Sequence, residues 1–120
     1  DFLEDLVRDL EGSVAIAEAA GVAREKIMVD PGVGFAKSYE QNLLCIRRLE
    51  RLHQLHLPIL LGTSRKSVIG LTLDLPADQR VEGTLVTTVM AVLQDCAFVR
   101  VHDVKENRRA ITMTEAILGR

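Results

Sequence analysis

Three short polar segments contain the residue types that could bind a polar ring beside an anion. They are residues 30–37 (DPGVGFAK), 62–66 (GTSRK) and 100–103 (RVHD). The first begins with an acid, the second holds a serine and a lysine, and the third holds an arginine and a histidine. A carboxylate accepts paired hydrogen bonds from neighbouring ring N–H and NH₂ donors, whereas Arg, Lys and His bind oxyanions. The segments therefore predict recognition of an amino-substituted heterocycle next to an anionic group.

The pair Arg100 and His102 is the most informative of these features. Residues two apart on a strand face the same side, so these side chains should project together, with Val99 and Val101 opposite. A charge on a buried face needs a partner. A bound phosphate or diphosphate is one candidate, and a structural ion pair with an acid such as Asp30 is the other. Position alone leaves both interpretations open.

The remaining polar residues each have a structural alternative. Asp30 precedes Pro-Gly and suits a turn, and Phe35 suits either a plug for a barrel mouth or an apolar wall for an aromatic substrate. Ser64 and Lys66 would ordinarily belong to a solvated basic loop. However, eight-stranded barrels often build an anion site from the loops after strands seven and eight. This precedent favours Lys66 as a ligand for an anionic or carbonyl oxygen and Ser64 as a hydrogen-bond donor.

Two other patterns are weak. Gly32 and Gly34 fit no dinucleotide fingerprint, because the third glycine would fall at Lys37, and no P-loop. We interpret these glycines as allowing a tight turn. His53 and His56 lie three apart, but no acid or cysteine ligand set accompanies them, so we expect a solvent-facing helix end.

Alternating helices and strands must position the polar segments. Apolar residues at spacings of three and four predict a helix over 1–20, with Gly21 as its C-cap. The segments 27–29, 57–61 and 97–102 are predicted strands. A fully apolar strand such as 57–61 is typical of a parallel sheet covered on both faces.

The segments between the strands predict further helices. Ser38 and Gln41 have the spacing of a capping box, and Asp103 and Glu106 form a plausible N-cap pair. Gly83 would allow close backbone packing. Helices are predicted over about 38–55, 80–95 and 103–118, and a long connection over 62–79.

One helix followed by successive strand–loop–helix units predicts an α/β fold with parallel strands. Open doubly wound sheets and closed barrels both use such units, and both bind ligands at the C-terminal ends of their strands. The predicted strands are too few to close a barrel, and the first helix lacks a preceding strand. We therefore expect the C-terminal three β/α units, strands 6–8, of a TIM (β/α)₈ barrel, preceded by a helix and forming one domain part over residues 1–120.

Composition excludes several classes of protein. The chain has 120 residues, 48% of them hydrophobic and 3% aromatic, which predicts one aliphatic core. The formal net charge of −2 argues against nucleic-acid or membrane partners. Cys45 and Cys96 suit reduced core thiols of a cytoplasmic protein. Because the chain begins at Asp1 in what looks like a helix, we expect a piece of a longer polypeptide.

In order, spacing and position, residues 30–37, 61–67 and 99–104, with Glu82-Gly83-Thr84, closely resemble the C-terminal motifs of bacterial dihydropteroate synthases. The resemblance covers essentially the whole chain. It implies a transferase of folate biosynthesis that joins 7,8-dihydropterin-6-ylmethyl diphosphate to p-aminobenzoate and releases diphosphate and 7,8-dihydropteroate. Sulfonamides compete for the p-aminobenzoate site of this family.

The resemblance also implies a role for each polar residue. Asp30 would hydrogen-bond the pterin ring, and Lys66 would contact the pterin near p-aminobenzoate. Ser64 and Phe35 would help to bind p-aminobenzoate. Arg100 would flank the pterin and, together with His102, hold the diphosphate as charge develops on it. Lys66 and Arg100 are the predicted catalytic residues, and the predicted substrate-binding set is Asp30, Phe35, Gly62, Ser64, Lys66, Arg100 and His102.

The family resemblance implies partners outside the chain. Mg²⁺ would be ligated through the diphosphate and a residue outside this chain, with no metal ligand inside it. Family members are usually homodimers. Because the motifs of the first five strands are missing, we expect the 120-residue chain alone to be inactive.

Two alternatives remain: a pterin-dependent methyltransferase-type barrel and a non-catalytic, flavodoxin-like binding module. The joint presence of Ser64-Arg65-Lys66 and 100–103 favours the synthase over the methyltransferase. A receiver-type module would need clustered acids where Asp30 stands alone.

Overall fold

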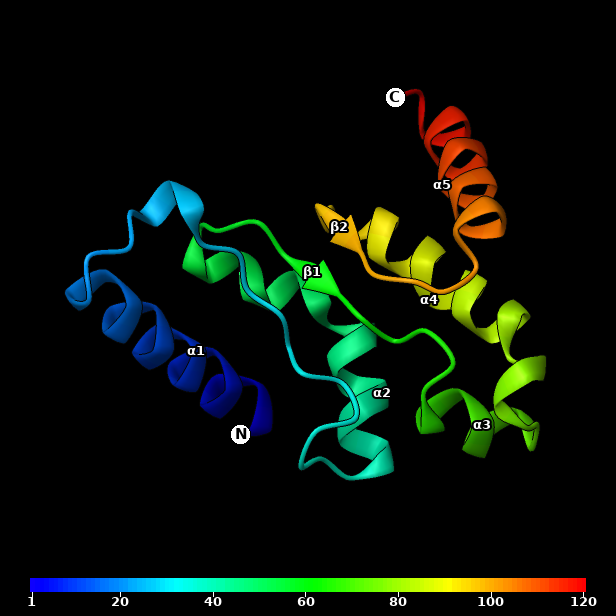
Figure 1. Cartoon of the computed structure of the whole chain (residues 1–120), viewed down its shortest axis with the longest axis horizontal. Helices are drawn as coiled ribbons and strands as arrows, with labels where there is room; N and C mark the ends of the chain where they lie inside the picture. The colour runs from blue at the N-terminus through cyan, green and yellow to red at the C-terminus, as the bar shows by residue number, and fades with distance from the viewer.

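The computed structural model describes residues 1–120 as helices around a small parallel sheet. Figure 1 shows the strands near the middle, with α1 and α5 on opposite sides and the two termini far apart. The predicted α/β class is confirmed. The α-helices are α1 (Phe2–Ala19), α2 (Tyr39–Arg47), α3 (Ser67–Leu73), α4 (Val81–Leu93) and α5 (Val104–Leu118); the strands are β1 (Leu60–Leu61) and β2 (Phe98–Val99); and 3₁₀ turns cover Arg24–Lys26, Leu49–Leu55 and Ala77–Gln79.

The strands are parallel, as predicted, but much shorter than the apolar runs suggest. Leu60 pairs with Phe98 and Leu61 with Val99, whereas the predicted strand 27–29 is reduced to one parallel bridge between Val29 and Ile59. The two outer segments are hydrogen-bonded to β1 on one side only. Each strand extends only over the residues that pair with a neighbour, and the pairing is limited to these few positions.

Helix α1 has the predicted extent and clear ends. The Asp1 carboxylate accepts a hydrogen bond of 3.0 Å from the Glu4 N–H. At the other end, Gly21 has φ +97°, and the Val22 N–H reaches the Ala17 carbonyl at 3.0 Å. This is a Schellman ending, in which a glycine adopts the left-handed conformation that other residues disfavour.

The predicted helix over 38–55 is interrupted. The capping box at its start is present, but α2 ends at Arg47 and a 3₁₀ turn follows. The Gln94 side chain spans the break: its Nε2 donates to the Ile46 carbonyl at 2.8 Å and its Oε1 accepts from the Glu50 N–H at 3.0 Å. A distant side chain therefore satisfies backbone groups that a continuous helix would have paired.

The structure corrects two further predictions. The connection 62–79 contains α3, whose β-branched residues and Gly70 have low helix propensity, so packing rather than local preference supports this helix. Asp103 precedes α5, but its side chain makes no capping bond, because the carboxylate binds Arg65 instead. The predicted close packing at Gly83 is confirmed, since a Cβ there would collide with Ile69.

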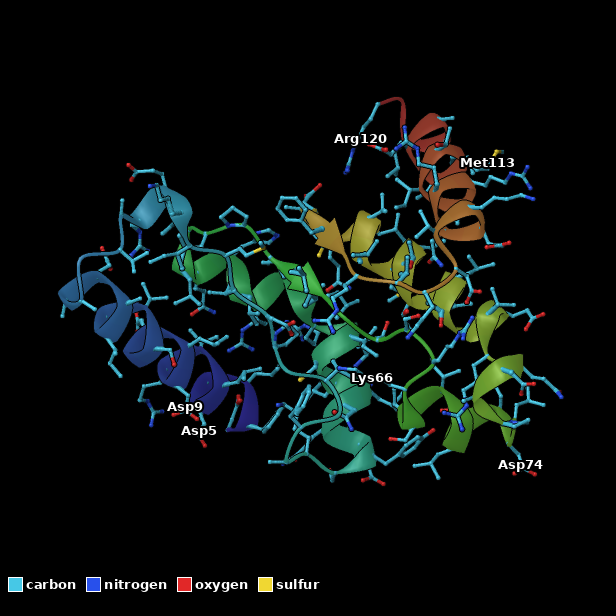
Figure 2. The ribbon with its side chains drawn as sticks, in the orientation of Figure 1. Asp5, Asp9, Lys66, Asp74, Met113 and Arg120 are labelled. Carbon is cyan, nitrogen blue, oxygen red and sulfur yellow. The ribbon has the colours of Figure 1, made fainter.

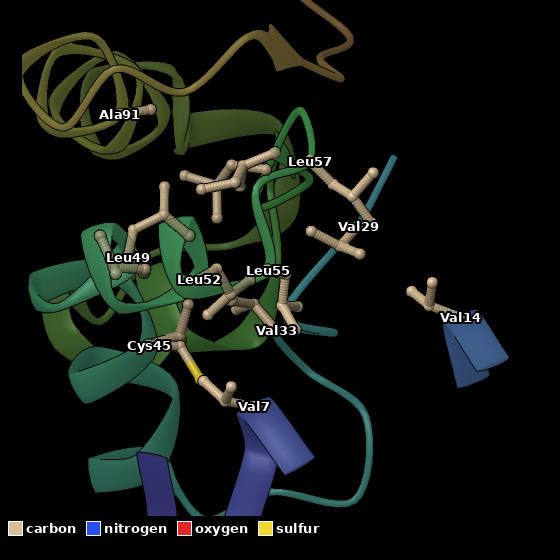
Figure 3. Close-up of a cluster of buried hydrophobic side chains, with 14 of the residues drawn as sticks. Val7, Val14, Val29, Val33, Cys45, Leu49, Leu52, Leu55, Leu57 and Ala91 are labelled. Carbon is tan, nitrogen blue, oxygen red and sulfur yellow. The ribbon is translucent and has the colours of Figure 1, made fainter. Parts of the chain in front are cut away.

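An aliphatic core holds these elements together, as the scarcity of aromatic residues predicts. Figure 3 shows members of this cluster from α1 (Val7 and Val14), α2 (Cys45) and the 3₁₀ turn that follows α2 (Leu49). Leu49 and Ile59 are both 0% exposed. The buried contacts fix β1, whose C-terminal end leads into the polar segment 62–66. No helix of the structure is long and apolar enough to cross a membrane.

Candidate active site

The structure brings the predicted binding residues together in one cavity of about 270 Å³. The cavity lies at the C-terminal ends of β1, β2 and the segment that ends at Val29. Figure 2 shows Lys66 near the middle of the molecule, whereas Asp74 and Met113 lie at its edges. Its lining consists of Asp30, Phe35, Gly62, Ser64, Lys66, Arg100, Val101 and His102. Val101 was expected on the opposite face, but β2 ends at Val99, so strict alternation no longer holds there.

Asp30 combines a turn role with an accessible acid. Its Oδ1 accepts a 2.7 Å hydrogen bond from the Gly32 N–H, an Asx-type turn. Its Oδ2 has no partner in the chain and lies 4.0 Å from where a Cβ on Gly62 would stand. A methyl group at Gly62 would therefore be in ordinary van der Waals contact with this oxygen, and both residues line the cavity.

The glycine loop lies directly against Lys66. Gly34 has φ +88°, and a Cβ there would come 3.3 Å from the Lys66 Cδ. The Gly34 N–H donates to the Asn42 Oδ1 at 2.8 Å, which ties the loop to α2. The loop makes the tight turn predicted for its glycines, and it also leaves room for a lysine.

Lys66 is held by the same loop. Its Nζ donates a 2.5 Å hydrogen bond to the Val33 carbonyl and lies 4.7 Å from the centre of the Phe35 ring. Phe35 is 68% exposed, so it forms a wall beside the ammonium group rather than a plug. A cation on an aromatic face is attracted to the ring quadrupole, which orients both side chains at the cavity.

The environment of Lys66 also alters its acidity. Partial burial lowers the pKa of Lys66, the Asp30 carboxylate opposes this effect, and the cations Arg100 and Lys37 lower the pKa further. A lysine with a lowered pKa releases a proton more readily than an exposed one. Such perturbation in a cavity is typical of a functional site.

Ser64 and His102 form the closest polar contact across the cavity. The Ser64 Oγ lies 2.7 Å from the His102 Nδ1 and accepts a 3.0 Å hydrogen bond from the His102 N–H. Ser64 is buried and His102 is exposed. The loops after β1 and β2 are thus joined at the cavity by one hydroxyl group.

Arg100 makes no ion pair and no side-chain hydrogen bond within the chain. The structural alternative of an Arg100–Asp30 pair is therefore wrong. The expectation that this charge is buried is also wrong, because Arg100 and His102 are both exposed. The guanidinium group and the His102 Nε2 are both left without a partner, and both are suited to an oxyanion.

Sequence reasoning missed the contacts that fix Arg65. This residue has φ +58°, a costly conformation for a residue with a side chain. Its N–H donates to the Thr84 Oγ1 at 3.2 Å, and its carbonyl accepts from the Arg80 Nη1 at 2.8 Å. The Asp103 carboxylate raises the pKa of Arg65 through a hydrogen bond. Two of these partners belonged to motifs noted in the sequence, Thr84 in Glu82-Gly83-Thr84 and Asp103 in residues 100–103, but neither motif indicated a contact with Arg65.

The two histidines outside the cavity lie on the surface, and one of them has a side-chain contact. His53 and His56 are both exposed, and the His53 Nε2 lies 2.8 Å from the Gln94 carbonyl oxygen. No three His, Cys, Asp or Glu side chains are grouped so as to hold a metal ion.

Comparison with known proteins shows which family the sequence resembles. A family model described as pterin binding enzyme matches residues 1–102. The chain is 54% identical to the dihydropteroate synthase of Clostridium beijerinckii over 100% of its own length and 45% of that protein. It therefore spans less than half of this relative.

Solved structures give the same result. A dihydropteroate synthase from Clostridium difficile, solved in the presence of pteroic acid, superposes with a TM-score of 0.94 at 50% identity, covering 98% of this chain and 44% of that one. A Yersinia pestis dihydropteroate synthase with a sulfonamide drug complex gives 0.96 at 39% identity, covering 99% and 43%.

Proposed function

Because the chain belongs to the pterin binding enzyme family, we propose that it forms part of a dihydropteroate synthase. The proposed reaction joins 7,8-dihydropterin-6-ylmethyl diphosphate to p-aminobenzoate, forming 7,8-dihydropteroate and diphosphate. The observation that carries the proposal is the single cavity lined by an accessible carboxylate, a lysine on an aromatic face and an unpaired Arg/His pair. The similar solved structures named with pteroic acid and with a sulfonamide support it.

The geometry supports a division of work within the cavity. The free Oδ2 of Asp30 can accept hydrogen bonds from a pterin ring, which presents adjacent N–H and NH₂ donors. Arg100 has an unpaired guanidinium group suited to a diphosphate, and His102 lies beside it in the lining. As diphosphate leaves, negative charge grows on its oxygens, and donors already in place stabilise that charge.

Lys66 and Phe35 stand where the two substrates would meet. The lysine can hold an oxygen or ring atom of the pterin, and the exposed Phe35 ring offers an apolar wall to an arylamine. The arylamine nitrogen is a neutral nucleophile, so correct positioning matters more than deprotonation. Lys66 and Arg100 are accordingly the residues proposed to act in catalysis.

The finer structural assignments belong to the same proposal. They are that residues 1–120 form the C-terminal part of a pterin-binding barrel domain, with strands 6–8 of a TIM (β/α)₈ barrel, in a cytoplasmic homodimer. The chain has no group of three or more His, Cys, Asp or Glu side chains that could hold a metal ion, and Mg²⁺ is commonly bound by one or two carboxylates together with substrate phosphates. We therefore assign no step to the ion, and its proposed site lies on the diphosphate and a residue outside the chain.

A chimera tests the proposed function. The portion of the C. beijerinckii enzyme that aligns with this chain, 45% of its length, is replaced by residues 1–120, and dihydropteroate formation is measured. We expect turnover in the chimera and at least a roughly tenfold loss of kcat/KM for Arg100→Met, because a donor to the transition-state charge is removed. Ser13→Ala, on the exposed face of α1, is the matched control.

Two results would contradict the proposal. One is a folded chimera without turnover, and the other is an Arg100→Met variant as active as the Ser13→Ala control. The 120-residue chain alone is expected to give no turnover, and activity of the isolated chain at the level of the full-length relative would show that the cavity is already complete.

A further inference from the structure

The contact between Ser64 and His102 involves the imidazole Nδ1, so the two tautomers of the neutral ring reverse the donor and acceptor roles in this contact. Ser64 Oγ accepts the backbone N–H of His102 at 3.0 Å, so one lone pair of the hydroxyl is already engaged. The same oxygen lies 2.7 Å from the His102 Nδ1. A hydroxyl has a single hydrogen, and a neutral imidazole has one N–H and one acceptor nitrogen.

Two arrangements satisfy the 2.7 Å contact. In one, the Ser64 O–H donates to Nδ1, and the ring carries its proton on Nε2. In the other, Nδ1–H donates to Ser64, and the hydroxyl hydrogen is left over. Ser64 is only 8% exposed, and its Oγ has no acceptor in the chain other than His102. A buried hydroxyl hydrogen without an acceptor is costly, so the first arrangement is favoured.

We propose that Ser64 is a positioning residue that selects the Nε2–H tautomer of His102 whenever the ring is neutral, so that Nε2–H can donate to a phosphoryl oxygen. His102 lines the cavity beside the unpaired guanidinium group of Arg100, and its Nε2 makes no hydrogen bond in the chain. Arg100 supplies charge to an oxyanion, whereas His102 supplies a fixed hydrogen bond that needs no additional proton.

The surrounding structure keeps this contact in register. β1 and β2 pair residues 38 apart, Leu60 with Phe98 and Leu61 with Val99. Ser64–His102 and Arg65–Asp103 have the same separation of 38. Side-chain contacts therefore continue the strand pairing beyond the last backbone hydrogen bonds. The Arg65–Asp103 pair fixes the position of the neighbouring Ser64–His102 pair.

The identity of the anion as the diphosphate of a pterin substrate rests on the proposed function, but the tautomer does not. The assignment has a chemical consequence within that function. Because Nε2 carries the hydrogen, His102 cannot accept a proton from the arylamine through that atom. It acts on the leaving group, and Ser64 is committed to His102 rather than to p-aminobenzoate.

The test is nitrogen NMR of the 120-residue chain labelled with ¹⁵N-histidine. Long-range ¹H–¹⁵N correlations distinguish the two tautomers of a neutral ring, at a pH chosen by titrating the ring itself. His102→Gln identifies the signal among the three histidines. We expect a predominant Nε2–H pattern for His102, loss of that bias in Ser64→Ala, and an unchanged pattern in Ser13→Ala.

An Nδ1–H pattern in the unsubstituted chain would overturn the proposal, and so would an unchanged tautomer in Ser64→Ala. Inorganic diphosphate is then added as the probe. A shift of the Nε2 signal, with several-fold weaker binding in Ser64→Ala, supports the donor role. If the tautomer is as expected but diphosphate leaves every signal unchanged, the anion-binding part of the proposed function fails and the tautomer assignment stands.

Discussion

The Arg65 guanidinium group donates two hydrogen bonds to the Asp103 carboxylate, with Nη2 2.9 Å from Oδ1 and Nε 3.4 Å from Oδ2. This fork joins the loop after β1 to the residue that precedes α5. Bidentate Arg–carboxylate contacts fix geometry as well as charge. The residues on either side, Ser64 and Lys66, both line the cavity, so the fork determines where two site residues stand.

We expect Asp103→Asn to weaken binding of inorganic diphosphate several-fold without unfolding the chain. The amide can accept only one of the two hydrogen bonds, so the loop after β1 loses its fixed position. Calorimetric titration measures the affinity, and circular dichroism confirms the fold. Glu106→Gln, an exposed acid on α5, is the control. Equal affinities in the two variants would show that the fork does not position the site.

The neighbours of Lys66 should shift its pKa in opposite directions. Burial lowers the pKa of Lys66, Asp30 raises it and Arg100 lowers it. Asp30→Asn should therefore lower the pKa further, whereas Arg100→Met should raise it. NMR titration of the lysine side-chain carbon next to Nζ measures the pKa directly. Shifts in the same direction for both variants would contradict this electrostatic description.

The same lowered pKa predicts how stability depends on pH. The unfolded chain keeps the Lys66 proton to a higher pH than the folded chain does. The free energy of unfolding should therefore rise with pH between the lowered folded value and the unfolded value. Lys66→Met removes this contribution. The free energy of unfolding, measured with urea across that range, should rise more steeply with pH in the unsubstituted chain than in Lys66→Met. An equal pH dependence in the two chains would refute the prediction.

Gln94→Ala should destabilise the fold by about 1–3 kcal/mol, because backbone groups at the break after α2 lose their buried partners. Gln94 contacts the Ile46 carbonyl and the Glu50 N–H, whereas Gln54 is exposed. Urea unfolding of Gln94→Ala and Gln54→Ala measures the difference. A loss of the same size in both would mean that the contacts across the break add nothing.

Leu49→Ala should cost about 2–5 kcal/mol, as expected for a large-to-small change in a packed core. Leu49 is 0% exposed, whereas Leu71 is 68% exposed. Leu71→Ala is therefore the matched control and should change the free energy of unfolding little. Equal losses in the two variants would show that the cluster around Leu49 is not the core.

The sequence predicts the elements better than their lengths. The ends of α1 and the start of α2 were predicted correctly, because Asp1, Gly21, Ser38 and Gln41 act through bonds between near neighbours. The break after Arg47 was not predicted, since it depends on Gln94 from α4. Strand length failed for the same reason: pairing depends on neighbours that the local pattern does not show.

In the candidate site, too, local features could be predicted and distant contacts could not. Its polar residues could be named because each follows a strand, and strand ends meet at one edge of a sheet. The hydrogen-bond partners of these residues could not be predicted from the sequence. Nothing local to Arg65 indicates that its N–H, carbonyl and side chain each have a distant partner, or that Asp103 serves Arg65 rather than the helix that it precedes.

The strand pairs and the two side-chain pairs share the same separation of 38 residues, and this agreement limits how the loop between Leu61 and Ser64 can change in length. A single residue inserted between Leu61 and Ser64 would shift both side-chain pairs relative to the strands at once. Such an insertion should be far less tolerated than one in the exposed turn near Asp74 and Ala77. The loop after β1 is therefore constrained in length as well as in sequence: Gly62, Ser64 and Lys66 line the cavity, and the number of residues between Leu61 and Ser64 keeps the side-chain pairs aligned with the strands.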